Sequence, residues 1–130
     1  MRSLWVAALV AMVLVPASAG AEPAYSPALK TCLESAAGSS TLGQIQCIGV
    51  ELKVQDKRLN QAYAQVMADL NPRQQARLRS AQRAWIAFRD ADCVALYDED
   101  WGTLSRVNAN NCVMQRTAER ADYLVDYLKP

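Results

Sequence analysis

The residues of this 130-residue chain that could do chemistry are four cysteines and a set of carboxylates, because the sequence contains no histidine. Without an imidazole, the common pairs of nucleophile and general base cannot be assembled. Two carboxylates could still hydrolyse a glycosidic bond, and Asp56, Asp90 and Asp92 are the candidates. A packed bundle of this size offers no obvious cleft for a sugar chain, so we interpret these carboxylates as structural or solvated. We therefore expect neither catalysis nor a cofactor.

The first 21 residues are typical of a secretory signal peptide. Arg2 gives a positive start, residues 4–15 are almost wholly apolar, and small residues before the expected cleavage after Ala21 fit the cleavage pattern. The apolar run is too short for a comfortable membrane span, although a membrane anchor is the alternative. No cysteine follows the run closely, so we expect no lipid anchor after signal removal. The mature domain, residues 22–130, is expected to be periplasmic or secreted.

The charge balance of the mature domain limits the class of partner. Loss of Arg2 reduces Lys+Arg from 14 to 13, against 13 Asp+Glu, so the mature domain is formally neutral. General nucleic-acid binding needs a basic surface. We therefore expect a protein partner and no nucleic acid.

The cysteine spacing favours disulfides over metal or redox chemistry. No two cysteines are close enough for a zinc knuckle, and no Cys-x-x-Cys is present. The acidic run at residues 98–100 also lacks the glycine and the alternating ligands of a calcium loop, so we expect no metal. An even cysteine count in a small exported chain indicates two disulfides, formed by Cys32, Cys47, Cys93 and Cys112.

The elements that must position these residues are predicted to be helices, because apolar residues recur at spacings of three and four and no run alternates like a strand. We expect a short helix from Ser26-Pro27 to about residue 37 and long helices over residues 41–70, 72–97 and 103–128. Proposed caps are Ser26, Thr41 with Gln44, Asn71 with Gln74, and Thr103 or Ser105. The fold class is all-α: a small antiparallel bundle of three long helices and one short N-terminal helix, with two disulfides.

The apolar stripes of the three long helices define the predicted core. They comprise Ile45, Ile48, Leu52, Leu59, Val66 and Leu70; Leu78, Ala81, Trp85, Phe88, Asp92 and Ala95; and Val107, Asn111, Met114, Ala118, Ala121, Val125 and Leu128. Cysteines at similar heights on either side of a turn favour the pairs Cys32–Cys47 and Cys93–Cys112. Cys47 and Cys93 are also level across the turn at residues 71–72, so their pairing remains the alternative.

Folding the second and third helices back at Asn71-Pro72 predicts a polar network between them. Asp56 would meet Arg89, and Asn60 and Tyr63 would meet Gln82, beside a buried Trp85. Such a network fixes the register of two helices more than it adds stability.

The same residues carry a resemblance to a known family. The motifs are Asp56-x-x-Leu59-Asn60-x-x-Tyr63, Gln82-x-x-Trp85-Ile86-x-x-Arg89-Asp90-x-x-Cys93, and Cys112 followed by Thr117-x-x-Arg120-x-x-x-Leu124. In order, spacing and cysteine count they resemble the LprI-type lysozyme inhibitor domain over residues 32–128. The resemblance implies an exported, helical, cysteine-bearing protein that inhibits lysozyme by direct binding. The matched residues have the character of a scaffold rather than of a contact surface.

A candidate contact surface is the run of Asp98, Glu99, Asp100 and Trp101, hereafter the acidic loop. Lysozymes that such inhibitors target are commonly basic, and an exposed tryptophan beside three carboxylates suits a basic partner. The alternative for the loop is a solvated turn with Trp101 tucked over the end of the bundle. The alternative for the whole protein is a structural or adaptor role in the cell envelope.

Overall fold

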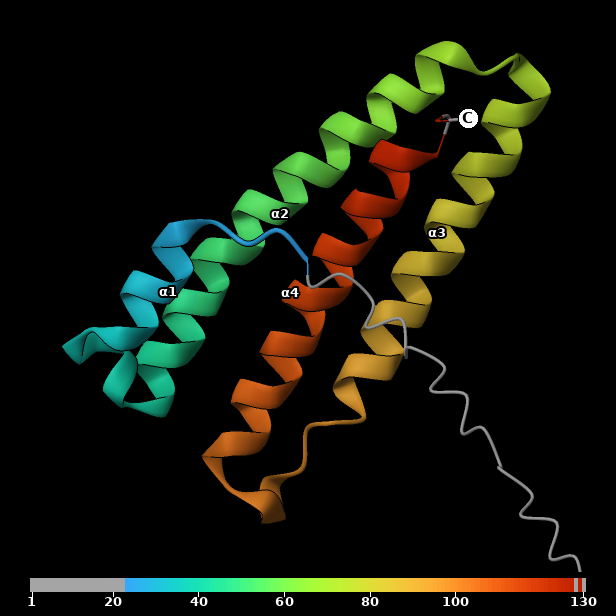
Figure 1. Ribbon diagram of the computed structural model, residues 1–130. Helices are drawn as coiled ribbons and strands as arrows, with labels where there is room; N and C mark the ends of the chain where they lie inside the picture. The colour runs from blue at the N-terminus through green and yellow to red at the C-terminus, as the bar shows by residue number, and fades with distance from the viewer. Residues whose placement is uncertain (1–22, 128, 130) are drawn as a thin grey trace, which may run out of the picture.

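The computed structural model describes residues 23–127 and 129. The predicted signal peptide and Leu128, the last member of the third stripe, lie outside the described residues. The elements are α1 (Pro27–Glu34), the 3-10 turn η1 (Ala36–Ser39), α2 (Thr41–Asp69), α3 (Pro72–Val94), the 3-10 turn η2 (Glu99–Trp101) and α4 (Thr103–Asp126) (Figure 1). The described part of the chain contains no strand, which confirms the predicted all-α class of three long helices and one short one.

The core lies between α2 and α4, which run side by side in the same direction (Figure 1). Ala118 and Ala121 of α4 are fully buried, and their small side chains let the two helices approach closely. One end of the core is built by Leu59, Ala62, Val66, Leu78, Ala121 and Leu124, and the other by Leu29, Cys47, Ile48 and Met114. The short α1 contributes Leu29 to the second cluster and packs against the first part of α2.

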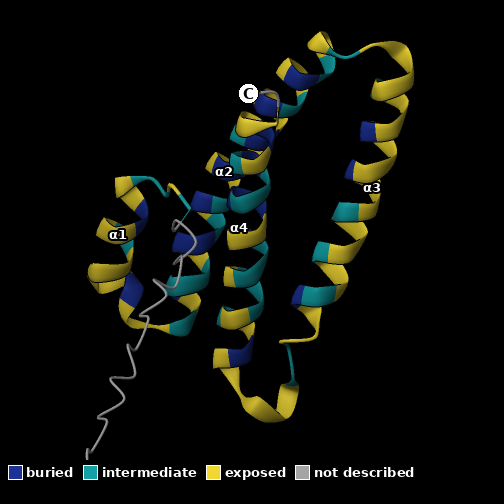
Figure 2. Ribbon diagram, turned by 45° about the vertical axis from the view of Figure 1, so that its right-hand side comes forward, coloured by how far each residue is buried: buried dark blue, intermediate teal, exposed yellow. Residues whose placement is uncertain are grey.

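Helix α3 runs antiparallel to α2 and α4 (Figure 1) and stands to one side of this pair (Figure 2), and its packing is mainly on α4. Only Leu78, Gln82 and Cys93 of this helix are buried, and Trp85 is half-buried against the core. Phe88, predicted in the core, is instead 57% exposed. The sequence pattern placed Phe88 on the buried face of α3. Because α3 packs closely mainly on α4, the buried face of the helix is narrower than the predicted apolar stripe, and Phe88 lies outside it.

Helix boundaries follow the predicted turn chemistry at some ends and not at others. Asn71 and Gln74 form the predicted capping box at the start of α3. Ser40, not Thr41, caps α2, and its hydroxyl accepts from the backbone N–H of Gly43. Gly102 precedes α4 with a φ of 71°, a conformation that glycine adopts without strain, so neither Thr103 nor Ser105 is the cap.

Two disulfides brace the bundle. Cys32 is bonded to Cys47, with a Cα–Cα distance of 5.7 Å, and Cys93 to Cys112, at 5.4 Å. The favoured pairing is therefore confirmed and the Cys47–Cys93 alternative is wrong. The first bond ties α1 to α2, and the second ties the end of α3 to α4. Within the described residues, no helix is long and apolar enough to cross a bilayer.

Candidate functional site

The acidic loop projects from the end of the bundle where α3 gives way to α4 (Figure 1). Its backbone is held from within. The Asp98 carboxylate accepts from the backbone N–H of Asp100 at 2.8 Å. The buried Ser105 hydroxyl lies 2.8 Å from the carbonyl oxygens of both Asp98 and Gly102. The Cys93–Cys112 bond joins α3 and α4, the two helices that flank the loop. The loop is therefore fixed at both ends and by its internal hydrogen bonds.

Three of the four side chains of the acidic loop are exposed to solvent. Trp101 is 68% exposed, so it is not tucked over the bundle end. Glu99 and Asp100 are exposed and Asp98 is half-buried. An exposed indole beside carboxylates provides both a large apolar contact and a local negative charge, which are the requirements for binding a basic protein surface.

One cation borders the acidic loop. The Arg106 guanidinium lies 5.7 Å from the centroid of the Tyr97 ring and donates to the Tyr97 hydroxyl at 3.4 Å. That hydroxyl in turn lies 3.5 Å from a carboxylate oxygen of Glu99. Arg106 is therefore linked to the loop through Tyr97, and Glu99 and Asp100 remain exposed.

The six residues of the predicted polar network line one cavity of about 250 Å³ between α2 and α3, hereafter the α2–α3 cleft. They are Asp56, Asn60 and Tyr63 on α2 and Gln82, Trp85 and Arg89 on α3. The structure thus brings these residues to one place, as their spacing indicated.

The predicted bonds across the α2–α3 cleft are nevertheless absent among the described contacts, and the Asp56–Arg89 pair is wrong. Asp56 accepts from Asn60, one turn along the same helix, at 3.2 Å. Arg89 pairs with Asp90 at 2.7 Å and donates to Thr117 of α4 at 3.3 Å. The prediction assumed that helices adjacent in sequence pack together along their length, whereas α3 packs mainly on α4.

A second polar junction between α3 and α4 centres on Arg120, which the network prediction did not include. Its Nε donates to Gln82 at 3.0 Å, and its guanidinium lies 5.7 Å from the centroid of the Trp85 ring and 4.9 Å from that of Tyr123. Burial lowers the pKa of Arg120 from its ordinary value, partly opposed by the nearby Tyr123 and Tyr127. The Thr117-x-x-Arg120 motif carried this signal, since both of its polar residues bind α3.

A buried carboxylate in the first half of α2 holds the N-terminal segment. Glu51, 1% exposed, accepts from the Ser26 backbone N–H at 2.9 Å, from the Ser26 hydroxyl, and from Gln55 at 2.6 Å. Gln55 also donates to the carbonyl of Ala24. Burial alone would raise the pKa of Glu51, but these hydrogen bonds outweigh it and lower the pKa. This site could have been predicted from the sequence by two polar residues four apart, Glu51 and Gln55, on the buried side of α2.

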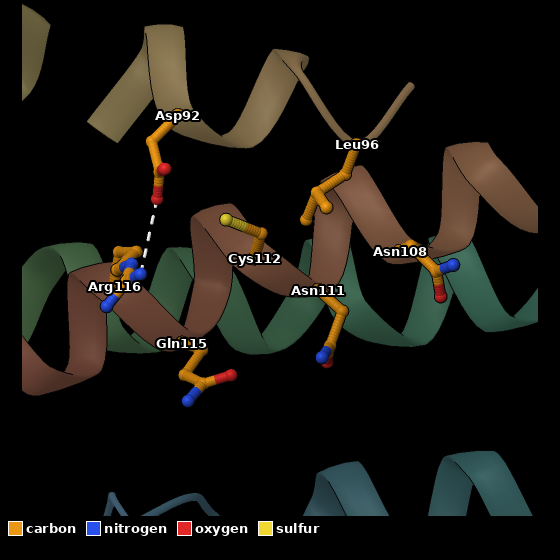
Figure 3. A pocket seen from close by; sticks show the side chains of 7 residues that line it. All are labelled: Asp92, Leu96, Asn108, Asn111, Cys112, Gln115 and Arg116. Carbon is orange, nitrogen blue, oxygen red and sulfur yellow. Dashed lines mark hydrogen bonds and ion pairs between the residues drawn. The ribbon is translucent and has the colours of Figure 1, made fainter. Parts of the chain in front are cut away.

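A cavity of about 460 Å³ lies beside the Cys93–Cys112 bond, behind the acidic loop. Figure 3 shows Asp92 reaching from α3 to Arg116 of α4, where the two side chains form an ion pair at 3.2 Å. Asp92, Cys93 and Cys112 are close enough to hold a metal among the described residues, but both sulfurs are consumed by the disulfide and cannot act as thiolate ligands. The remaining lining is mainly amide side chains of α4: Asn108, Asn111 and Gln115.

The three carboxylates considered for acid–base chemistry have other contacts. Asp56 is bonded to Asn60, Asp90 to Arg89, and Asp92 to Arg116. Two of these aspartates are thus held in ion pairs, and the third accepts a hydrogen bond from a neighbouring side chain on its own helix.

Comparison with known proteins identifies the family. The family described as "Lysozyme inhibitor LprI" matches residues 32–124, which is most of the chain. No curated protein and no solved structure gives a significant match. The matched segment begins at the first disulfide cysteine and ends at Leu124 in the core, and it contains both disulfides, the α2–α3 cleft and the acidic loop. The chain belongs to the LprI lysozyme inhibitor family.

Proposed function

We propose that this protein is an exported lysozyme inhibitor that binds a lysozyme and blocks its substrate cleft, with no chemistry of its own. The observation that carries the proposal is the family match over residues 32–124. Two disulfides support export, because such bonds form and persist in oxidising compartments. The periplasm or the medium is therefore the expected location.

The acidic loop is the contact surface that we assign to this function. The mature domain is neutral overall, so attraction to a basic lysozyme must come from a local patch of negative charge. The loop places three carboxylates in succession immediately before Trp101, which is 68% exposed. Tryptophan is a frequent anchor at the centre of protein interfaces, and complementary charge speeds the encounter of two proteins.

The bracing of the loop supports binding as a rigid body. A loop already fixed by Ser105, Gly102 and the Cys93–Cys112 bond loses little conformational entropy when it docks. A projecting tryptophan on a fixed loop is suited to enter a concave site, such as the substrate cleft of a glycosidase. Residues of the α2–α3 cleft would then maintain the helices and take no part in the contact.

The test is a turbidity assay in which dried bacterial cells are lysed by lysozymes of several classes. Purified residues 22–130 are titrated into each enzyme, and residual activity is measured. The proposal predicts stoichiometric loss of activity for at least one class. If every class retains full activity at a large excess of the protein, the inhibitor assignment is wrong, and the adaptor role, tested by pull-down from periplasmic extract, takes its place.

A further inference from the structure

We propose that the α2–α3 cleft binds a small oxyanion, a molecule that carries a carboxylate or a phosphate group. α2 and α3 are joined at one end by a short turn and stand apart beyond it (Figure 1). The cleft between them has a volume of about 250 Å³, below the usual range of about 300–1,000 Å³ for sites of drug-sized ligands. A compact anion therefore suits it better than an extended one.

The residues that carry the family resemblance meet at this cleft. Apart from Arg79 and Arg83, each residue that lines it is a motif position within residues 56–63 or 82–89. If these residues served only to join α2 to α3, they would bond to one another across the cleft. Within the described part of the chain, no hydrogen bond or ion pair joins a lining residue of α2 to one of α3. The polar groups are therefore brought together without being used on each other.

The hydrogen-bonding groups left open in the cleft are mainly donors. Arg79 and Arg83, one turn apart on α3, have no ion pair and no side-chain hydrogen bond among the described residues. The Gln82 oxygen accepts from Arg120 at 3.0 Å, which leaves the N–H groups of its amide. The Tyr63 hydroxyl also lacks a hydrogen bond to any described residue. Two guanidinium groups, an amide and a hydroxyl are the donors that carboxylate and phosphate oxygens accept from.

The charge of the cleft is positive, although the mature domain is neutral overall. Three arginines and one carboxylate line it. One of these arginines, Arg89, is paired with Asp90, and the carboxylate, that of Asp56, accepts from its own helix. The charge without a partner among the described residues is therefore that of Arg79 and Arg83. Guanidinium groups pair with the planar oxygens of carboxylate and phosphate through two parallel hydrogen bonds.

The wall beside these donors is apolar. Leu59 is 4% exposed, and Tyr63 and Trp85 pack against the same core cluster. Hydrogen bonds beside such a wall are stronger than in open water, because the local dielectric is lower. Arginines on a convex surface would be solvated, whereas Arg79 and Arg83 border a concave site with further donors.

The test is an NMR titration of ¹⁵N-labelled residues 22–130 with inorganic phosphate and, separately, with citrate. Sodium chloride at the same ionic strength is the reference. The two indole N–H signals provide an internal comparison, since Trp85 lines the cleft and Trp101 lies in the acidic loop. We expect saturable shifts at Trp85 and at the side-chain amide of Gln82, and none at Trp101. The tighter of the two probes identifies the anion as phosphate-like or carboxylate-like.

The arginine pair has a matched control on the neighbouring helix. R79Q/R83Q should bind the anion about tenfold or more weakly than the parent, because hydrogen bonds to charged groups are lost. K53Q/K57Q removes two exposed cations that are also one turn apart but do not line the cleft, and it should bind within about twofold of the parent. All four substituted residues are exposed, so both variants should keep the helical circular dichroism of the parent.

Tyr63→Phe tests the cleft from the side of α2. The variant keeps the ring against the core and removes the hydroxyl, so anion binding should weaken about threefold or more. The proposal is overturned if neither probe shifts the Trp85 signal beyond the effect of chloride, or if Trp85 and Trp101 respond alike. It is also overturned if the arginine and lysine variants lose the same affinity, or if Tyr63→Phe binds as the parent does. Anion binding does not depend on the proposed lysozyme inhibition, and the two are measured separately.

Discussion

The guanidinium of Arg89 lies 5.2 Å from the centroid of the Trp85 ring, one turn back on the same helix, and donates to Thr117 of α4 rather than to Asp56 of α2. This relationship decides how the bundle is held together. α3 is attached mainly through α4. Among the polar residues of the α2–α3 cleft, Asp56, Asn60, Gln82 and Arg89 have described bonds, and these run within their own helix or to α4.

The Arg89 contacts predict unequal effects for the two members of the rejected pair. Arg89→Ala removes the contacts with Trp85 and Thr117 and should lower the free energy of unfolding by about 1–2 kcal/mol. Asp56→Ala should change it by less than about 0.5 kcal/mol, because Asp56 is exposed and its one bond among the described residues is to the exposed Asn60. Chemical denaturation of both variants and of the double variant measures this. A coupling energy above about 1 kcal/mol would show that the cleft closes in solution.

Trp85 and Phe88 provide a second comparison on the same helix. Trp85 packs against the core cluster, so Trp85→Ala should destabilise the protein by about 3 kcal/mol, the lower end for a large aromatic because it is only half-buried. Phe88→Ala should cost less than about 1 kcal/mol because Phe88 is 57% exposed. The check is thermal and denaturant unfolding. Equal losses would mean that α3 is rotated so that Phe88 faces inward.

These comparisons also show which parts of the structure the sequence could predict. The Asn71–Gln74 capping box and both disulfides depend on local spacing across a turn, and local geometry is specified by neighbouring residues.

The error at Asp56 and Phe88 has a different origin. The periodicity of α3 shows that the helix is amphipathic, but it does not say which neighbour the apolar side meets. The small side chains of Ala118 and Ala121 allow α4 to pack closely against α2, and α3 packs mainly against α4. A hydrophobic stripe wide enough for two neighbours then remains partly exposed. The exposure of Trp101 likewise depends on packing at the bundle end, which spacing does not encode.

The disulfides should contribute substantially to stability. Peptide mapping of the oxidised protein should recover Cys32 with Cys47 and Cys93 with Cys112. Replacing either pair by serine should lower the free energy of unfolding by about 3 kcal/mol, because each bond closes a loop with a sequence separation of 15 or 19 residues. A Cys47–Cys93 peptide, or an unchanged melting temperature after complete reduction, contradicts this.

Glu51 predicts a loss of stability in acid. Its folded-state pKa is lowered by the Ser26 and Gln55 hydrogen bonds, so the unfolded chain takes up a proton more readily than the folded protein. The stabilisation is fully present above the ordinary carboxyl pKa of about 4.3 and is lost as the pH falls through the lower folded value. Glu51→Gln, which cannot ionise, should unfold more easily at pH 7 by about 1–3 kcal/mol and show a smaller acid-induced loss.

The measurement is the unfolding midpoint of parent and Glu51→Gln between pH 7 and pH 3. Glu34→Gln serves as the control, because Glu34 is exposed and, within the part of the chain that the structure describes, is paired with Lys30 one turn away on the same helix. The assignment of Glu51 fails if the parent and the Glu51 variant lose stability in parallel as the pH falls.

The central claim, that the acidic loop blocks a lysozyme, is tested most directly by inhibition with a loop variant. D98N/E99Q/D100N/W101A removes three charges and the indole while Asn at 98 can still accept the hydrogen bond of residue 100. The control E34Q/D69N/D126N/L42A removes the same charge and one exposed apolar side chain away from the loop. Both variants should keep the helical circular dichroism of the parent.

The decisive readout is residual activity of a lysozyme that the parent inhibits, measured at matched inhibitor concentrations. We expect the loop variant to inhibit at least tenfold less than the parent and to associate more slowly at low salt. As salt increases, screening should slow the association of the parent until the two rates converge. The control should inhibit as the parent does. A folded loop variant that inhibits as strongly as the parent would contradict the claim and place the contact elsewhere on the bundle.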